Sequence, residues 1–139
     1  MHEIVLDTNV LVAALRSKRG ASYQLVRMIG DGKWRLNISV ALALEYEDVL
    51  KRAGMVPEFN EPEVDAFLEF VFANSNLVPF VLRRRPSLRD PDDDRILEVA
   101  AQCRAMIVTH NRRDFTGAQR LGIAVRTPAE FLAMLREGK

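Results

Sequence analysis

The stretch Ile4-Val5-Leu6-Asp7-Thr8-Asn9 decides the fold class, because a short apolar run ends there abruptly at a carboxylate. A run of this kind, apolar at every position, is typical of a strand buried on both faces of a parallel sheet. Residues 9–16 (NVLVAALR) follow with the apolar spacing of a helix. The stretch therefore predicts a buried strand that leads directly into a helix, with Asp7 between them.

The rest of the chain repeats this alternation of strand and helix. Further apolar runs predict strands over residues 34–38, 106–108 and 123–125. Residues 77–82 predict an edge or irregular strand, because Pro79 has no backbone N–H to donate to a ladder. Helical spacing predicts helices over residues 23–29, 40–53, 62–73, 91–103 and 128–136.

Punctuation residues support these boundaries. Ser39 is a favourable N-cap for the helix that follows it. Gly30 and Gly54 are expected to stop the helices before them. Asp90 can cap the helix at residues 91–103, where Pro91 takes the first position, which needs no backbone N–H.

Alternating strands and helices favour an α/β fold with a parallel sheet covered on both faces. Ligands of such sheets bind in the crevice beyond the carboxyl ends of the strands. Asp7 and the segment 109–114 fall at two of those ends. The crevice is therefore the expected place of any functional site.

Length and composition indicate one globular domain over residues 1–139, expected in the cytoplasm. Apolar residues make up 48% and charged residues 28%, which is ordinary for a folded domain and excludes a disordered chain. The single cysteine, Cys103, excludes an intrachain disulfide framework and fits a reducing compartment. No signal peptide or apolar run of about 20 residues is visible, so no membrane partner is expected.

Charge distribution is more informative than the net charge of +1, which argues neither for nor against nucleic acid. Arg84 and Arg85 precede a cluster of aspartates at positions 90 and 92–94, and Arg112 and Arg113 precede Asp114. Basic side chains beside acidic ones would let a site hold both a metal ion and a phosphate. Solvated loop charges explain each arginine about equally well.

Two carboxylates in the first half of the chain are candidates for chemistry. Asp7 faces the carboxyl edge of the sheet, where a charge needs a partner, although capping the next helix is an equally good explanation. Glu45 borders the apolar stripe of its helix, which Leu42 and Val49 mark. A glutamate at such a border is usually solvated or paired, so Glu45 alone is a weak candidate.

The second half of the chain adds Asp94 and the segment after the third strand. Acids in the first turn of a helix complement its dipole, which explains most of the aspartates before Leu97. Asp94 lies deepest and could face inward. Thr109, Asn111 and Asp114 follow the strand at residues 106–108, where each either contributes to a site or only ends a strand or caps a turn.

Taken together, carboxylates spread over distant segments suit an oxygen-ligated cation. Mg²⁺ needs only one or two direct carboxylates and keeps water molecules as its other ligands. Mn²⁺ accepts the same ligands. Zinc is not expected, because His2 and His110 lack the spacing of zinc ligands and Cys103 lies on an apolar helix face.

Several motifs, in one order along nearly the whole chain, resemble those of the PIN domain family. The opening IVLDTN at residues 4–9 is the first, and Ile38-Ser39 leading to Glu45 is the second. DPDDD at residues 90–94, leading into Leu97, is the third. The string IVTHNRRDF at residues 107–115 is similar to the closing motif of the family.

The resemblance implies a three-layer α/β/α sandwich around a mostly parallel sheet, and an Mg²⁺- or Mn²⁺-dependent ribonuclease. It is nearest to the bacterial and archaeal branch that supplies the toxins of toxin–antitoxin pairs, which implies an antitoxin partner and a homodimer. By position, Asp7, Glu45 and Asp94 would form the acidic core, with Asn9 and Thr109 in support. Many family members carry an aspartate where this chain has Asn111, so either Asn111 or Asp114 completes the site.

The leading hypothesis is therefore hydrolysis of single-stranded RNA by a metal-activated water. Asp7 and Asp94 would contact the metal, Glu45 would hold it or orient the water, and the arginines at positions 84, 85, 112 and 113 would grip phosphates. One alternative is a non-catalytic module that binds RNA or protein, which Asn111 keeps open. A second is an aspartyl phosphatase or phosphotransferase of haloacid-dehalogenase type with Asp7 as nucleophile, although that family expects an acid in place of Asn9.

Overall fold

In the part of the chain that the computed structural model describes, residues 1–79 and 91–139, five strands form one sheet. Their order is β3-β2-β1-β4-β5, and every neighbouring pair is parallel. The strands are β1 (His2–Leu6), β2 (Trp34–Ser39), β3 (Asn76–Val78), β4 (Met106–Val108) and β5 (Val125–Arg126). The predicted parallel α/β class is confirmed.

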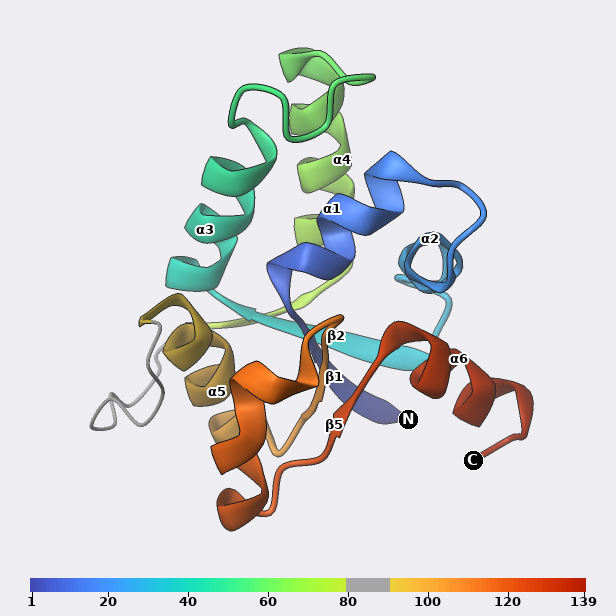
Figure 1. Ribbon diagram of the computed structural model, residues 1–139, viewed down its shortest axis with the longest axis vertical. Helices are drawn as coiled ribbons and strands as arrows, with labels where there is room; N and C mark the ends of the chain where they lie inside the picture. Colours follow the sequence, from blue (N-terminus) through green and yellow to red (C-terminus); the bar gives the residue numbers. More distant parts are fainter. Residues whose placement is uncertain (80–90) are drawn as a thin grey trace.

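Helices cover both faces of this sheet (Figure 1). One face carries α5 (Pro91–Cys103) and η1, a 3₁₀ segment (Arg112–Leu121). The other carries α1 (Thr8–Arg16), α2 (Ala21–Arg27) and α6 (Pro128–Arg136), and the pair α3 (Val40–Leu50) and α4 (Glu61–Ala73) extends beyond α1. The fold is the predicted α/β/α sandwich.

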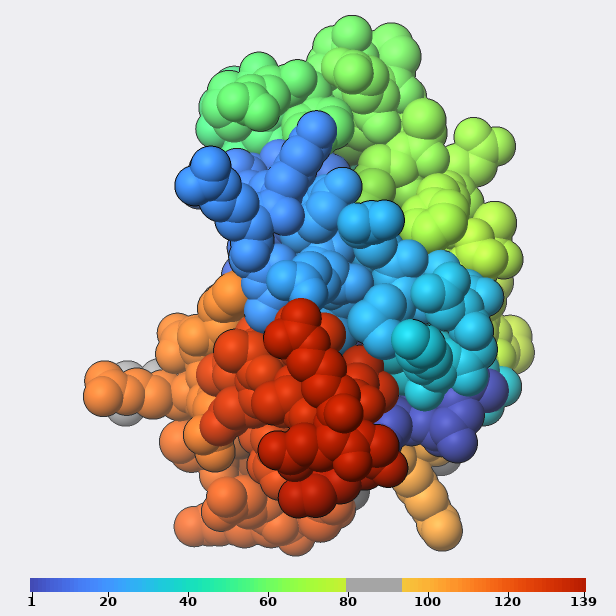
Figure 2. All heavy atoms as spheres, turned by 90° about the vertical axis from the view of Figure 1, so that its right-hand side faces the viewer, coloured from blue at the N-terminus to red at the C-terminus, as the bar shows by residue number. Residues whose placement is uncertain are grey.

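The helix α6 lies beside α2, so the last helix of the chain closes the layer that the first ones begin (Figure 2). Arg136 Nη2 donates a hydrogen bond to Gln24 Oε1 at 2.6 Å. The His2 ring also hydrogen-bonds to the carbonyl oxygen of Lys139, which brings the two ends of the chain together. None of the helices described is long and apolar enough to cross a membrane.

The central strand β1 explains why the opening stretch dominates the sequence. Ile4, Val5 and Leu6 are completely buried, and β1 pairs with both β2 and β4. A strand covered by helices on both faces has no solvent-facing side, which is why its sequence is continuously apolar. At Asp7 the chain leaves the sheet and enters α1.

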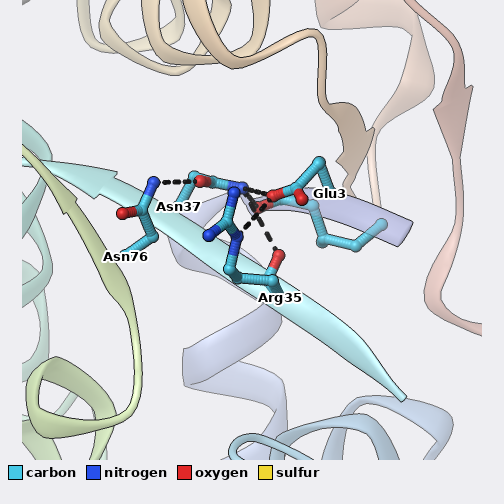
Figure 3. Close-up of polar contacts among 5 residues, drawn as sticks. Glu3, Arg35, Asn37 and Asn76 are labelled. Carbon is cyan, nitrogen blue, oxygen red and sulfur yellow. Dashed lines mark hydrogen bonds and ion pairs between the residues drawn. The ribbon is translucent and has the colours of Figure 1, made fainter. Parts of the chain in front are cut away.

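Polar side chains on the α5-facing side of the sheet tie β1, β2 and β3 together (Figure 3). Arg35 Nε donates to Glu3 Oε1 at 2.8 Å, and Asn37 Nδ2 donates to the same oxygen at 3.0 Å. Asn37 is fully buried, and its Oδ1 accepts a hydrogen bond from Asn76 Nδ2 at 2.7 Å. A buried amide costs free energy unless it is hydrogen-bonded, so this network favours the observed register.

The helix boundaries follow their capping residues. Ser39 caps α3 as predicted, since its hydroxyl oxygen accepts from Leu42 N. Two capping boxes that the sequence analysis did not note begin α4 at Asn60 and α6 at Thr127. Gly30 has a φ of 89°, and a Cβ there would lie 2.7 Å from Asn74 Oδ1, so the predicted stop after α2 requires glycine.

Some expected boundaries were wrong. β5 begins at Val125, not at residue 123, because the Ile123 N–H donates to Ala118 O and belongs to the end of η1. The segment η1 was expected only as a local turn around Asp114. Its Phe115 is buried in the core. β3 spans Asn76–Val78, whereas a strand was expected over residues 77–82. Residues 80–82 of the expected strand lie outside the described part of the chain.

Several predictions fall on residues 80–90, outside the described part of the chain. They are the loop at residues 83–90, the Asp90 cap, and the phosphate contacts of Arg84 and Arg85. The backbone of α5 is described from Pro91, and its side chains from Asp94 onward. The start of α5 at Pro91 agrees with the sequence prediction.

Candidate active site at the carboxyl edge of the sheet

The candidate site lies where the order of the strands reverses direction. From β1 the chain moves to β2 and β3 on one side, and later to β4 and β5 on the other. In parallel α/β sheets, ligands bind at such a point, beyond the carboxyl ends of the two strands on either side of it. The Asp7 N–H donates to Val108 O at 2.9 Å, which places Asp7 directly beside the end of β4.

The Thr109 hydroxyl connects the two strand ends. It donates to Asp7 Oδ2 at 2.7 Å, and both residues are buried. The same oxygen accepts from Asn111 N at 3.0 Å and from Asn9 Nδ2 at 3.5 Å. Because these two donors face the lone pairs of Thr109 Oγ1, its proton is directed at Asp7. Asn9, Thr109 and Asp7 thus form one hydrogen-bonded network, and the support of a metal site by Asn9 and Thr109 stays a prediction.

The Asn9 amide also fixes the segment that follows β4. Its Oδ1 accepts from His110 N at 3.3 Å, while its Nδ2 reaches Thr109. The His110 ring forms a hydrogen bond with Ser22 Oγ of α2 at 2.7 Å. Burial lowers the pKa of His110, and the charge of Asp7 opposes that shift. The His110 ring therefore anchors this segment to α2.

Asp7 is a buried carboxylate whose ionisation is disfavoured by its surroundings. Its side chain is 8% exposed, and this burial raises its pKa above the ordinary value. The hydrogen bond from Thr109 and backbone N–H groups of Thr8 and Asn9 stabilise the carboxylate, and the charge of Asp114 disfavours it. A desolvated carboxylate with a like charge nearby is an environment that a bound cation would relieve.

Glu45 turns out to be buried rather than bordering solvent, with 8% of the residue exposed. Thr8 Oγ1 donates to Glu45 Oε2 at 2.9 Å, and Thr8 is the residue directly after Asp7. The neighbouring Tyr46 hydroxyl donates to Leu6 O, at the carboxyl end of β1. Burial, and then the charges of Asp7 and Glu45, raise the pKa of Tyr46 well above its ordinary value. Both carboxylates therefore lie close to the end of β1.

Asp94 is also buried, with 8% of the residue exposed, as predicted for the deepest aspartate of its helix. The helix α5 packs against β1, β2 and α3. Arg95, the next residue, brings its Nη1 to 3.7 Å from Glu45 Oε1. The start of α5 thus lies beside Glu45 of α3.

The rim residues are placed less decisively. Asp114 and Asn111 are exposed, and the charge of Asp114 acts on Asp7. Arg112 Nη1 pairs with Glu130 Oε2 at 3.3 Å, which directs it toward the start of α6 rather than toward the three acids. Arg113 is exposed. Which of Asp114 and Asn111 completes the site stays a prediction.

The donor set fits a hard divalent cation, because its members are carboxylate, hydroxyl and amide oxygens. Within the described residues, no three histidine, cysteine, aspartate or glutamate side chains gather closely enough to hold a metal ion by themselves. Mg²⁺ accepts one or two carboxylates and completes its shell with water, so a looser arrangement is compatible with it. A closed zinc-type cage would not be.

Sequence reasoning missed Thr8, Arg95 and the contact between Ser22 and His110. Thr8 sits beside a candidate carboxylate, which was a usable signal, but its target Glu45 is 37 residues away. Nothing in the sequence distinguishes Arg95 from the other arginines near it, and its contact with Glu45 joins residues of two different helices. Nothing in the sequence links Ser22 to His110. The two residues are 88 positions apart, and they come into contact because α2 lies beside the segment that follows β4.

Comparison with known proteins gives one family and a consistent fold. A family model described as PIN domain matches residues 3–113. VapBC from Salmonella typhimurium bound to DNA contains a similar chain, with a TM-score of 0.62, 18% identity, and 92% of this chain and 99% of that one covered. A chain of VapBC-1 from nontypeable Haemophilus influenzae has a TM-score of 0.62 and 16% identity, with 91% of this chain and 98% of that one covered. A chain of VapBC2 from Rickettsia felis, in a structure with a DNA fragment from its promoter, has a TM-score of 0.60 and 16% identity, with 90% of this chain and 98% of that one covered. No curated protein matches the chain by sequence.

Proposed function

The chain belongs to the PIN domain family, and from this premise we propose that it is an Mg²⁺- or Mn²⁺-dependent endoribonuclease that hydrolyses single-stranded RNA. One observation carries the proposal. Asp7, Glu45 and Asp94 are far apart in sequence, yet all three are buried. Glu45 accepts a hydrogen bond from Thr8, the residue after Asp7, and faces Arg95, the residue after Asp94. Burying three carboxylates costs free energy that a bound cation would help to offset, which supports a divalent metal ion at this position.

Asp7 and Asp94 would hold the metal, with Glu45 holding it as well or orienting the attacking water. Such a cation supplies charge stabilisation at the phosphate and lowers the pKa of a water molecule. Thr109 keeps Asp7 in place through its 2.7 Å hydrogen bond, and Thr8 does the same for Glu45 at 2.9 Å. Because these partners are themselves buried, the carboxylates need little rearrangement when charge develops.

The raised pKa of Asp7 predicts how the proposed cleavage activity depends on pH. Burial favours the neutral carboxylic acid, and only the carboxylate is a good ligand for a divalent cation. Cleavage is therefore expected to increase as the pH rises through the pKa of Asp7. The completion of the site at its rim by either Asp114 or Asn111 belongs to the same proposal.

The proposal extends to partners. The chain shares its fold with chains of three VapBC structures, which supports an antitoxin protein as a partner and the role of toxin for this chain. A homodimer is supported by Val40 and Leu44, one turn apart on α3 and 55% and 61% exposed. Co-purification with the product of an adjacent gene tests the first, and light scattering of the purified chain tests the second.

A non-catalytic module that binds RNA or protein is the second candidate. The observation in its favour is that the described residues hold no group of three metal-binding side chains. Such a module would bind RNA equally well with or without a divalent cation. The two candidates therefore differ in their response to chelation.

The deciding experiment compares cleavage of a mixed single-stranded RNA by wild type and Asp94→Asn, each with Mg²⁺, Mn²⁺ or excess EDTA. Asp48→Asn is the matched control, because Asp48 is an exposed α3 aspartate that pairs with Arg52. Metal-dependent cleavage lost only in Asp94→Asn supports the nuclease. Cleavage that persists in EDTA contradicts it, and binding without cleavage in every protein favours the module.

A further inference from the structure

The two carboxylate oxygens of Glu45 face partners of different kinds. Oε2 accepts a hydrogen bond from the Thr8 hydroxyl at 2.9 Å, and Thr8 is buried at the end of β1. Oε1 faces Arg95 Nη1 at 3.7 Å. One side of the carboxylate is thus held by a neutral donor of the core, and the other side faces a cation.

The contact with Arg95 is the looser of the two. A distance of 3.7 Å is too long for a hydrogen bond and leaves an electrostatic attraction. The Arg95 side chain is 43% exposed, whereas that of Glu45 is 7% exposed. A long and partly solvated side chain can move away from Glu45 at little cost, while Thr8 cannot.

We propose that Arg95 is the resident counter-cation of Glu45, which a divalent metal ion replaces, and that the replaced guanidinium then contacts the RNA phosphate. This inference rests on the metal site of the proposed function. A fixed positive charge at this carboxylate repels a second cation and weakens its binding. The same charge, once displaced toward solvent, offers a planar pair of donors that matches a phosphate.

Arg95 would thereby link the two binding events. Before the metal ion binds, Arg95 compensates the buried charge of Glu45 and so stabilises the empty site. After it binds, the metal ion takes over that compensation, and Arg95 becomes available to the substrate.

The test measures Mn²⁺ affinity by titration calorimetry, without RNA, in wild type, Arg95→Gln, Arg95→Lys and Arg52→Gln. We expect Arg95→Gln to bind Mn²⁺ on the order of threefold to fivefold more tightly, because the competing charge is gone. Arg95→Lys keeps the charge and should bind as wild type does. Arg52→Gln is the matched control, since Arg52 pairs with Asp48 at 2.8 Å about two turns further along the chain from Glu45.

A second measurement addresses the phosphate. Binding of a non-cleavable 2′-O-methyl single-stranded RNA is followed by fluorescence anisotropy at saturating Mn²⁺. Arg95→Gln is expected to bind this RNA several-fold more weakly than wild type although it binds Mn²⁺ more tightly. A merely structural role for Arg95 would weaken both kinds of binding together.

The outcomes separate this inference from the proposed nuclease. Equal Mn²⁺ affinity in wild type and Arg95→Gln would overturn the role of Arg95 and leave the nuclease proposal intact. The predicted opposite changes in a protein that cuts no RNA would support Arg95 and contradict the nuclease. A wild type that binds no Mn²⁺ would overturn both.

Discussion

The two ends of β1 carry carboxylates that the fold treats in opposite ways. Glu3 lies near the amino end of the strand, and Asp7 follows its carboxyl end. The pKa of Glu3 is lowered, chiefly by its hydrogen bond with Arg35. Burial opposes this shift as the second-largest cause, and the hydrogen bond with Asn37 adds to the lowering. The pKa of Asp7 is raised, with burial as the largest cause.

The difference lies in what surrounds each charge. At the amino end, Arg35 supplies a cation at 2.8 Å, and the network reaches Asn76 on β3 (Figure 3). At the carboxyl end, the described residues give Asp7 hydrogen-bond donors that carry no formal charge, and the charge of Asp114 opposes its ionisation. A carboxylate that the fold itself neutralises supports structure, whereas one kept desolvated is suited to bind a cation.

The largest expected effect is on catalysis. Asp7→Asn should reduce metal-dependent RNA cleavage by at least about 100-fold, because it removes a proposed metal ligand. Glu3→Gln is the matched carboxylate-to-amide change at the other end of β1 and should leave the rate within about twofold of wild type. Single-turnover cleavage of a labelled RNA measures both.

If the two variants lost activity equally, the contrast between the ends of β1 would be wrong. Thermal unfolding of each variant separates loss of a site from loss of the fold.

The next effect concerns the hydroxyl that holds Asp7. Thr109→Val should lower the cleavage rate about tenfold and shift its pH dependence to higher pH. The reason is that the Thr109 hydrogen bond lowers the pKa of Asp7, so its loss raises that pKa further. A pH–rate profile measures the shift. Thr109→Ser keeps the hydroxyl and should retain the wild-type profile, and an unshifted profile in Thr109→Val would contradict this role.

A smaller effect should appear in stability, with the opposite sign. The folded state binds the Asp7 proton more tightly than the unfolded chain does, so ionisation at neutral pH disfavours folding. Asp7→Asn should therefore raise the free energy of unfolding of the metal-free protein at pH 7, by about 0.5–2 kcal/mol. The gain should disappear as the pH falls to the unfolded pKa of about 3.9. Urea unfolding in EDTA measures it, and a destabilised variant at pH 7 would refute the assignment.

The smallest effect is the corresponding change at Glu3. Its lowered pKa stabilises the folded state above the unfolded pKa of about 4.3, and this contribution is lost as the pH falls through the folded pKa. Because Arg35 is about half exposed, Glu3→Gln should cost only about 0.2–1 kcal/mol at pH 7. Urea unfolding at several salt concentrations checks this, since salt should reduce the difference.

Local patterns were sufficient for much of the fold. The continuously apolar Ile4-Val5-Leu6 predicted the central strand, and Ser39 predicted the start of α3. Such features depend on burial and on capping within a few residues. The end of η1 and the start of β5 were not predictable in this way, because they depend on how η1 packs against α5 and β5, which fixes the hydrogen bond from Ile123 N to Ala118 O.

The sequence by itself determined which residues could enter a site, through their order around the predicted strand ends and their resemblance to the PIN domain motifs. Only the tertiary structure decided which of them meet. Thr8 reaches Glu45, and Thr109 reaches Asp7 across 102 residues, because parallel strands bring their carboxyl ends to one edge. Arg95 lies near Glu45 because α5 packs beside α3. Periodicity specifies the exposed or buried face of an element, but its neighbours follow from how the sheet and its helices pack.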